Sequence, residues 1–296
     1  NKWFSCFNLR LMMYGYGNMM SATNRLFSGG GGLSYLLDTY GGAVVGYSLR
    51  KIDSTYSGNV IRVRRSSDDA EEDIGLNGNL LDTSALTTFV GANDGFVVSW
   101  YDQSGNARAI TQSTGANQPK IVSSGSLIVG SNGFPSIQTD GNDFFSNSGY
   151  TFKGSNSSVF CVWKANNGGS FQALFSSNNN DNIAQYFASR GTTSLRYFET
   201  SGDFSATALG TNDFLLSICQ DSTPTALIQE NNSTIYNSSS GISSVDADGL
   251  RLFRRVSATN PMANGVQMQE FIIFDSDLTS QISDVNTDIN NYYSIY

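Results

Sequence analysis

Acid–base chemistry in this chain must come from carboxylates, hydroxyls and amides, because its 296 residues include no histidine. Ser-His-Asp and Cys-His catalytic sites and histidine-ligated zinc are therefore excluded within one chain. The cysteines Cys6, Cys161 and Cys219 have no CxxC spacing, so they indicate neither a disulfide framework nor a thiolate metal site. What remains is a pair of carboxylates of the kind that glycosidases use, or a binding site without catalysis. We expect no cofactor.

Asp181 is the first carboxylate that could act in catalysis. It closes the stretch Ala-Leu-Phe-Ser-Ser-Asn-Asn-Asn-Asp at 173–181 and has asparagines around it. Asparagine and aspartate favour turns because their side chains hydrogen-bond to the nearby backbone. We therefore favour a turn-forming role for Asp181 over that of a nucleophile.

Glu270 is the second candidate carboxylate. It lies in a predicted strand over 267–274, where alternation places it on one face with three apolar residues. These residues are Met268, Ile272 and Phe274. A carboxylate buried among them needs a partner, and the arginines nearest in sequence are Arg254 and Arg255. We favour a structural salt bridge over catalysis.

The run Trp100-Tyr-Asp-Gln-Ser-Gly-Asn106 has two interpretations. As a glycan site, Trp100 and Tyr101 would stack on sugar rings while Asp102 and Gln103 hydrogen-bond to hydroxyls. As a structural element, the same residues would hold a tight turn after a strand whose aromatic side chains point inward. We favour the turn and keep the four residues as the candidate glycan site.

Oxygen-rich loops are the other candidates for ligand binding, since oxygen-only sites suit calcium or magnesium. One loop contains Asp140, Asn142 and Asp143, and another contains Asp246 and Asp248. Neither has the spacing of a known calcium loop. We predict no metal site and retain the first loop as the candidate to test.

The charge balance argues against nucleic acid and anionic membranes as partners. The formal net charge is -8 and the isoelectric point is near 4.5, whereas phosphate binding depends on basic clusters. The basic cluster Arg62, Arg64 and Arg65 is followed by acidic residues between 68 and 73, which predicts local pairing. No apolar run is long enough to span a membrane.

Short apolar and β-branched runs between turn signals predict an all-β fold. The strand candidates span residues 60–64, 96–101, 126–129, 158–164, 185–188, 194–198, 214–220, 225–229, 249–253 and 267–274. Ten such runs indicate a two-sheet antiparallel jelly-roll sandwich. Cys161 and Cys219 lie in two of these runs and are expected in the core.

Helical patterns are few. Apolar residues from Leu278 to Tyr292 recur at spacings of three and four, which predicts a short C-terminal helix with Thr279 as its cap. A shorter helix is expected over 84–90, capped by Asp82 or Thr83 and ended by Gly91. Residues 43–52 fit a helix or a strand equally well.

The first 32 residues differ in composition from the rest. They mix aromatic residues and methionines with few charges, and the run Gly29-Gly-Gly-Gly32 closes them. We do not expect a signal peptide, because the pattern lacks a charged start, a clean apolar core and a cleavage site. We expect residues 1–32 to be an assembly arm that packs on copies of this chain or on a larger particle; the alternative is an extension folded back on its own domain. The jelly roll then covers 33–296.

Three blocks carry a resemblance to a known family. Tyr47-Ser-Leu-Arg50, Val60-Ile-Arg-Val-Arg-Arg-Ser-Ser-Asp68 and the run 100–106, taken in order, resemble the opening of the catalytic domain of alpha-L-arabinofuranosidase B. The same blocks resemble structural proteins of bacteriophage virions. We assign 33–125 to this leading segment.

A second resemblance covers the remainder of the chain. Residues 135–145, with an Asp-Gly turn, and residues 269–279 resemble the opening and closing strands of concanavalin-like and laminin-G-like jelly rolls. We assign 126–296 to this portion of the sandwich.

The arabinofuranosidase resemblance implies a glutamate nucleophile shortly after a vicinal cysteine pair and an aspartic acid after a Gly-Gly step before the last strand. Here the first stretch has no cysteine pair and offers only Asp181. The second stretch reads Arg251-Leu-Phe-Arg-Arg255, with arginines where the family has Gly-Gly-Asp. The implied proton donor is missing.

These observations favour a non-enzymatic surface component of a virion, of the tail-fibre, head-fibre or capsid-decoration type, that adheres to a cell-surface glycan. The alternatives are an arabinofuranosidase-like glycoside hydrolase and a purely architectural subunit. Free, buried cysteines suit a protein assembled in the host cytoplasm that works outside the cell on the virion surface.

Overall fold

The computed structural model describes residues 35–164, 172–177, 186–190, 194–199, 202–206, 212–223, 225–238, 246–254 and 264–296. The chain divides into two compact units, Asn1–Ser34 and Tyr35–Tyr296. The predicted assembly arm and the candidate Asp181 lie outside the described residues. All described elements belong to the second unit.

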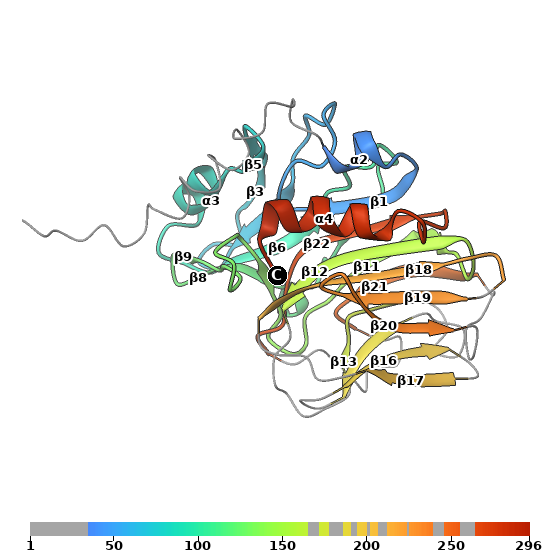
Figure 1. The fold of residues 1–296 in the computed structure, drawn as a ribbon. Coiled ribbons are helices and arrows are strands. Elements are labelled where there is room, and N and C mark those ends of the chain that lie inside the picture. Colours follow the sequence, from blue (N-terminus) through green and yellow to red (C-terminus); the bar gives the residue numbers. More distant parts are fainter. Residues whose placement is uncertain are drawn as a thin grey trace, which may run out of the picture. The chain divides into compact units, whose positions relative to one another are not determined.

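A large sheet dominates this unit (Figure 1). Its strands pair in the order β14-β21-β11-β7-β6-β8-β10-β22-β12-β18-β19-β20, with β1 on β22, β2 on β6, β3 on β2 and β9 on β8. The strands of the first half of the chain are β1 (Ala43–Ser48), β2 (Ile61–Arg65), β3 (Glu71–Ile74), β6 (Gly95–Trp100), β7 (Ile110–Thr111), β8 (Lys120–Ser123), β9 (Ser126–Leu127) and β10 (Ile137–Gln138). Those of the second half are β11 (Phe145–Phe152), β12 (Ser157–Lys164), β14 (Phe175–Ser176), β18 (Asp213–Gln220), β19 (Ala226–Glu230), β20 (Ser233–Ser238), β21 (Ala247–Leu252) and β22 (Gln267–Phe274).

Smaller elements complete the fold. A second sheet has the order β13-β15-β16-β17, and β4 pairs with β5. Their bounds are β13 (Gln172–Ala173), β15 (Tyr186–Arg190), β16 (Ser194–Glu199), β17 (Gly202–Ala206), β4 (Leu76–Asn77) and β5 (Leu80–Leu81). The helices are α2 (Leu36–Thr39), α3 (Thr83–Val90), the 3-10 turn η1 (Gly115–Asn117) and α4 (Ile282–Tyr293). Among the described helices, none has the length and apolar character needed to cross a membrane.

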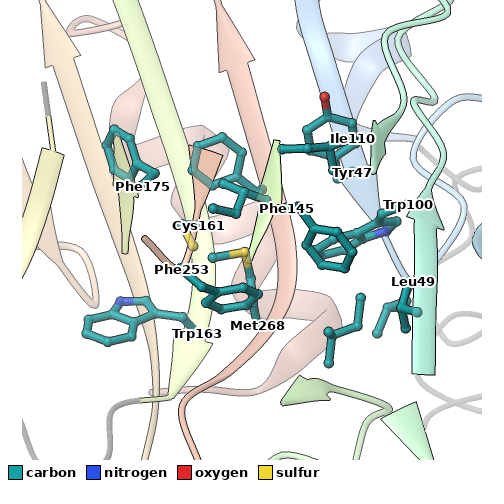
Figure 2. Packing of buried hydrophobic residues seen from close by; sticks show 14 of the residues in the cluster. Tyr47, Leu49, Trp100, Ile110, Phe145, Cys161, Trp163, Phe175, Phe253 and Met268 are labelled. Atoms are coloured by element: carbon teal, nitrogen blue, oxygen red, sulfur yellow. The ribbon is translucent and has the colours of Figure 1, made fainter. Parts of the chain in front are cut away.

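The large sheet folds over on itself, and the main core lies inside the fold, between its two halves. Side chains from β12, β18 and β22 meet those from β6, β11, β14 and β21. Figure 2 shows Trp163 of β12, Met268 of β22 and Phe145 of β11 in this core, together with Phe253, which follows β21. A second cluster covers the outer face of β12, β18 and β22, where α2 and α4 pack (Figure 1). Antiparallel pairing throughout and the scarcity of helix confirm the prediction of an all-β sandwich.

Each of the ten predicted strands overlaps a strand of the structure. Residues 43–48, left open between helix and strand, form β1 because they pair with β22. The shorter helix is confirmed as α3, and the Asp82 side chain accepts a hydrogen bond from the Ala85 amide as its N-cap. Cys161 and Cys219 are buried free thiols, as predicted.

The C-terminal helix is confirmed, but Thr279 does not cap it. Helix α4 begins at Ile282, with Gln281 at the N-cap position and no capping side chain. Thr279 instead donates its amide and hydroxyl to the Asp277 carboxylate in the turn before the helix. A side chain already used in that turn is not available to the helix terminus.

Local pairing of the basic cluster is also confirmed. Arg62 pairs with Asp73, Arg64 with Asp69 and Arg65 with Asp68, at N–O distances of 2.6–2.8 Å. These pairs face solvent on β2 and the turn after it. They leave no basic patch for phosphate binding at this position.

Candidate functional site

Glu270 of β22 forms a buried ion pair with Arg50, which follows β1. Arg50, just after β1, donates Nε to Glu270 Oε2 at 2.8 Å and Nη2 to Oε1 at 3.0 Å. Ser48 Oγ and the Tyr293 hydroxyl of α4 donate to the same Oε2 at 2.7 and 3.2 Å. The prediction of a structural salt bridge is confirmed, but its expected partner is wrong: Arg50, not Arg254, fills this place, and Arg255 lies outside the described residues.

The face assigned to Glu270 from simple alternation is only partly right. Val162 of β12 lies opposite Glu270, while the next residue, Trp163, lies opposite Met268, so Gln269 is an extra residue in β22. This β-bulge reverses the alternation. Met268 therefore points into the main core, whereas Glu270 shares the α4 side with Ile272 and Phe274.

Aromatic rings cover the Arg50 side of this ion pair. The Arg50 guanidinium carbon lies 4.5 Å from the Tyr292 ring centroid and 5.3 Å from that of Tyr293. Such stacking favours arginine over lysine, because the planar guanidinium keeps its hydrogen-bonding edge free while its face contacts a ring. Both carboxylate oxygens of Glu270 are occupied and 1% of the side chain is exposed. Glu270 therefore stabilises the packing of α4 on the sheet and has no access to a substrate.

Asp102 anchors the turn after β6. Its Oδ1 accepts hydrogen bonds from the amides of Gly46 and Ser104, at 2.8 and 2.9 Å. Its Oδ2 accepts from Ser104 Oγ and from the Arg108 amide, at 2.8 and 3.0 Å. Four donors saturate this buried carboxylate, so it holds the loop and β1 together.

The Gln103 side-chain amide also ties the turn after β6 to the segment that follows β1. Its Nε2 donates to the carbonyls of Ser48 and Arg50, both at 2.9 Å, and its Oε1 accepts from the Ile52 amide at 3.1 Å. The side chain is 1% exposed. Gln103 thus fixes the backbone that presents Arg50 to Glu270.

The aromatic residues of the motif point to different places. Trp100 is fully buried and its ring centroid lies 5.9 Å from that of Tyr47 (Figure 2). Tyr101 is partly exposed and its hydroxyl donates to Asp73 Oδ1 at 2.7 Å. Trp100 therefore has no free face for a sugar ring, and the four candidate residues do not form one surface. Their hydrogen bonds match the turn interpretation.

The loop at Asp140 closes on itself. Asp140 Oδ1 accepts from the Asn142 amide at 3.1 Å, and Asp143 Oδ2 accepts from the Asp140 amide at 2.8 Å. Burial raises the pKa of Asp143 to about 7. Among the residues that the structure describes, no group of three acidic or sulfur ligands converges here or elsewhere.

Glu230 is a carboxylate that the sequence did not single out. It ends β19 and is half-buried, and burial raises its pKa to about 7. It pairs in register with Leu216, whose side chain lies in the main core. Nothing in the sequence around it distinguishes it from an ordinary residue at a strand end.

The stretch at 251–254, where the arabinofuranosidase resemblance would place an acid, carries arginine side chains on an aromatic ring. The guanidinium carbons of Arg251 and Arg254 lie 5.7 and 4.7 Å from the Phe144 ring centroid. The Arg254 carbonyl accepts a hydrogen bond from Ser176 Oγ at 2.8 Å, which ties the end of this stretch to β14. The described part of this site offers positive charge and hydroxyl groups, without a carboxylate donor.

Solved structures of similar fold include arabinofuranosidases. The chain is 14% identical to a GH54 α-L-arabinofuranosidase soaked with a cyclic sulfate inhibitor, with a TM-score of 0.68. It is 15% identical to a mutant GH54 enzyme soaked with 4-nitrophenyl α-L-arabinofuranoside (TM-score 0.70) and 16% identical to an arabinofuranosidase complexed with arabinofuranosyl-α-1,2-xylobiose (TM-score 0.66). In each case the match covers 87% of this chain and 64% of the other. At these identities the likeness concerns the fold.

A search among curated proteins gave no match. Residues 42–225 match the family model described as "Alpha-L-arabinofuranosidase B, catalytic". The matched segment contains both the Tyr47–Arg50 block and the 100–106 turn, and it exceeds half of the chain. The chain therefore belongs to the alpha-L-arabinofuranosidase B catalytic-domain family.

Proposed function

We propose that this chain is a non-catalytic saccharide-binding protein that uses the arabinofuranosidase B fold for adhesion at a virion surface. The observation that carries the proposal is the pair Arg251 and Arg254 at the place where the family resemblance requires a proton donor. Glycoside hydrolysis needs two carboxyl groups flanking the scissile bond. An arginine remains charged at all working pH values and cannot supply that proton.

The second support is the state of the buried carboxylates. Glu270 forms an ion pair with Arg50, and the Asp102 carboxylate accepts four hydrogen bonds. Neither has an oxygen free to attack a sugar or to activate water. A family fold that retains its packing but has lost its donor is suited to binding without turnover.

The saccharide ligand is inferred from the fold relatives, which carry arabinofuranoside ligands in their solved structures. The virion setting is inferred from the resemblance of the sequence blocks to phage structural proteins and from the apolar composition of residues 1–32. Two buried free thiols suit a protein that folds in a reducing compartment.

A glycan array combined with a turnover assay on 4-nitrophenyl α-L-arabinofuranoside tests the proposal. We expect saturable binding to a defined set of glycans and no release of nitrophenol above the uncatalysed rate. Turnover that disappears on replacing a single carboxylate would refute the non-catalytic assignment. Absence of any glycan ligand would refute the adhesion assignment and favour an architectural subunit.

Glu230 gives the hydrolase a specific observation in its favour. A half-buried carboxyl whose pKa is raised to about 7 keeps a substantial protonated fraction at neutral pH, as a general acid requires. If the chain does turn over the aryl arabinofuranoside, Glu230→Gln is the first variant to measure. Loss of that turnover would identify Glu230 as its acid.

A further inference from the structure

Phe144 forms a fixed aromatic platform at the start of β11. Its amide donates to the Asn117 carbonyl at 3.1 Å, and its carbonyl accepts from Gln112 Nε2 at 3.1 Å. Both sides of its backbone are therefore held by the segment that precedes β8. A ring on a rigid backbone can orient a cation stacked on it.

Arg251 and Arg254 lie over this one ring. Arg251 belongs to β21, and Arg254 comes after Phe253, which adopts a positive φ of 69°. This turn in the backbone keeps Phe253 in the main core while the chain continues to Arg254. The guanidinium carbons lie 5.7 and 4.7 Å from the ring centroid.

Arg254 differs from four described arginines on β2 and just after β1. Arg50, Arg62, Arg64 and Arg65 each form an ion pair with an acidic side chain. Arg254 has no acidic partner within 4.0 Å among the described residues, and its Nε is buried there without a hydrogen-bond acceptor.

An unmatched, partly desolvated guanidinium is unfavourable by itself. A buried donor without an acceptor costs about 1–3 kcal/mol. A charge held away from water also interacts more strongly with an incoming counter-charge than a fully solvated one does. Arg254 therefore has a reason to bind an oxyanion, which would complete its hydrogen bonding.

We propose that Arg254, stacked on Phe144 and assisted by Arg251, binds the oxyanion of an acidic saccharide. The fork of N–H donors on a guanidinium matches a carboxylate, sulfate or phosphate group with two parallel hydrogen bonds. A guanidinium whose face contacts a ring can still use the N–H groups along its edge for such hydrogen bonds. This inference rests on the proposed saccharide-binding function and specifies its ligand class as negatively charged.

The net negative charge of the protein opposes the binding of acidic ligands. At a formal charge of -8 the molecule as a whole repels anions. Preference for an acidic sugar over its neutral counterpart must then come from a local site. A general electrostatic attraction cannot produce it.

Titration calorimetry with trigalacturonate and its methyl ester tests this directly, since the two ligands differ only in the charged group. Sulfated and phosphate-bearing oligosaccharides serve as parallel arms that identify the oxyanion. We expect the acid to bind at least roughly 10-fold more tightly than the ester, from the strength of charge-assisted hydrogen bonds. Arg254→Gln should abolish that preference.

Three variants separate charge, fork geometry and stacking. Arg254→Lys keeps the charge and loses the fork, so it should bind with intermediate affinity. Phe144→Leu keeps both arginines and removes the ring, and should weaken binding. Arg65→Gln removes an arginine from the exposed pair with Asp68 and should leave binding unchanged. Thermal unfolding of each variant confirms that it is folded.

Equal binding of acid and ester, or an unchanged preference in Arg254→Gln, would overturn the inference. The glycan array keeps the two proposals distinguishable. Neutral glycans bound without acid preference would leave adhesion standing and remove the anion site. Binding of free oxyanions at Arg254 with no glycan ligand on the array would leave the anion site standing and remove the adhesion proposal.

Discussion

Replacing Glu270 by glutamine perturbs the ion pair that links β1, β22 and α4. The amide has nearly the same size as the carboxylate and can still accept hydrogen bonds from Ser48 and Tyr293. What it cannot do is neutralise Arg50, which would remain charged in a site where its side chain is 9% exposed. The variant therefore isolates the effect of an unpaired buried cation.

The expected loss of stability is large. Removing one partner of a buried ion pair destabilises proteins by about 3–5 kcal/mol, because the remaining charge is left without compensation. For a unit of this size each kcal/mol lowers the melting temperature by about 2 °C. We therefore expect the melting temperature of Glu270→Gln to fall by about 6–10 °C.

Urea unfolding followed by tryptophan fluorescence measures this change, with thermal unfolding as a second readout. The matched control is Asp73→Asn, which breaks the more exposed pair with Arg62 and should cost about 0.5 kcal/mol. The double variant Arg50→Met, Glu270→Leu removes both charges and should recover most of the loss. A loss below about 1 kcal/mol for Glu270→Gln would show that water reaches the pair and would refute the reasoning.

Buried polar groups elsewhere in the unit give three further predictions. Asp102→Ala leaves the amides of Gly46, Ser104 and Arg108 without their acceptor and should cost about 2–4 kcal/mol in urea unfolding, whereas Tyr101→Phe, which removes one partly exposed hydrogen bond, should cost under about 1 kcal/mol. Asn286→Ala removes the hydrogen bonds of α4 to Gln229 and Ser217, and should cost about 1–3 kcal/mol and speed hydrogen exchange in α4; unchanged exchange would contradict this. Burial raises the folded-state pKa of Asp143 from 3.8 to about 7, so its contribution to stability is complete below about pH 4 and is lost as pH rises through 7. Asp143→Asn should therefore gain stability relative to the wild type between about pH 4 and pH 8, and parallel pH profiles of the two proteins would disprove the shift.

The elements that the sequence predicted well are those whose pattern is local. The strand 214–220 and the helix stripe from Leu278 to Tyr292 are recognisable because apolar residues recur at the period of their own element. Asp82 and Gly91 mark the ends of α3 for the same reason. By contrast, β11 (Phe-Ser-Asn-Ser-Gly-Tyr-Thr-Phe) escaped prediction, because small polar residues occupy its middle and it is recognisable as a strand only by its pairing with β21 and β7.

The surroundings of Glu270 could not be derived from local pattern. The bulge at Gln269 arises from the register of β22 against β12, and no residue type near Gln269 predicts it. The partner Arg50 lies 220 residues away in sequence, so proximity along the chain pointed to Arg254 instead. Long-range pairing set both the face of Glu270 and its partner.

The blocks that identify the family are structural residues, and this bears on what family membership means here. Asp102 binds the amide of Gly46, Gln103 binds the carbonyls of Ser48 and Arg50, and Ser48 and Arg50 in turn bind Glu270. These contacts form one continuous buried network from the 100–106 turn through β1 to α4. Selection for a stable sandwich is enough to maintain it, whether or not a sugar is cleaved.

The match to the arabinofuranosidase family therefore reports the fold of this chain and leaves its activity to be decided elsewhere. In our proposal the deciding residues lie outside that network, at the stretch where Arg251 and Arg254 contact the Phe144 ring. Loss of a proton donor at such a position removes catalysis and keeps the scaffold. Under the proposed function, a guanidinium at this position would favour a negatively charged ligand. Comparing the acidic saccharide with its neutral ester tests that preference directly.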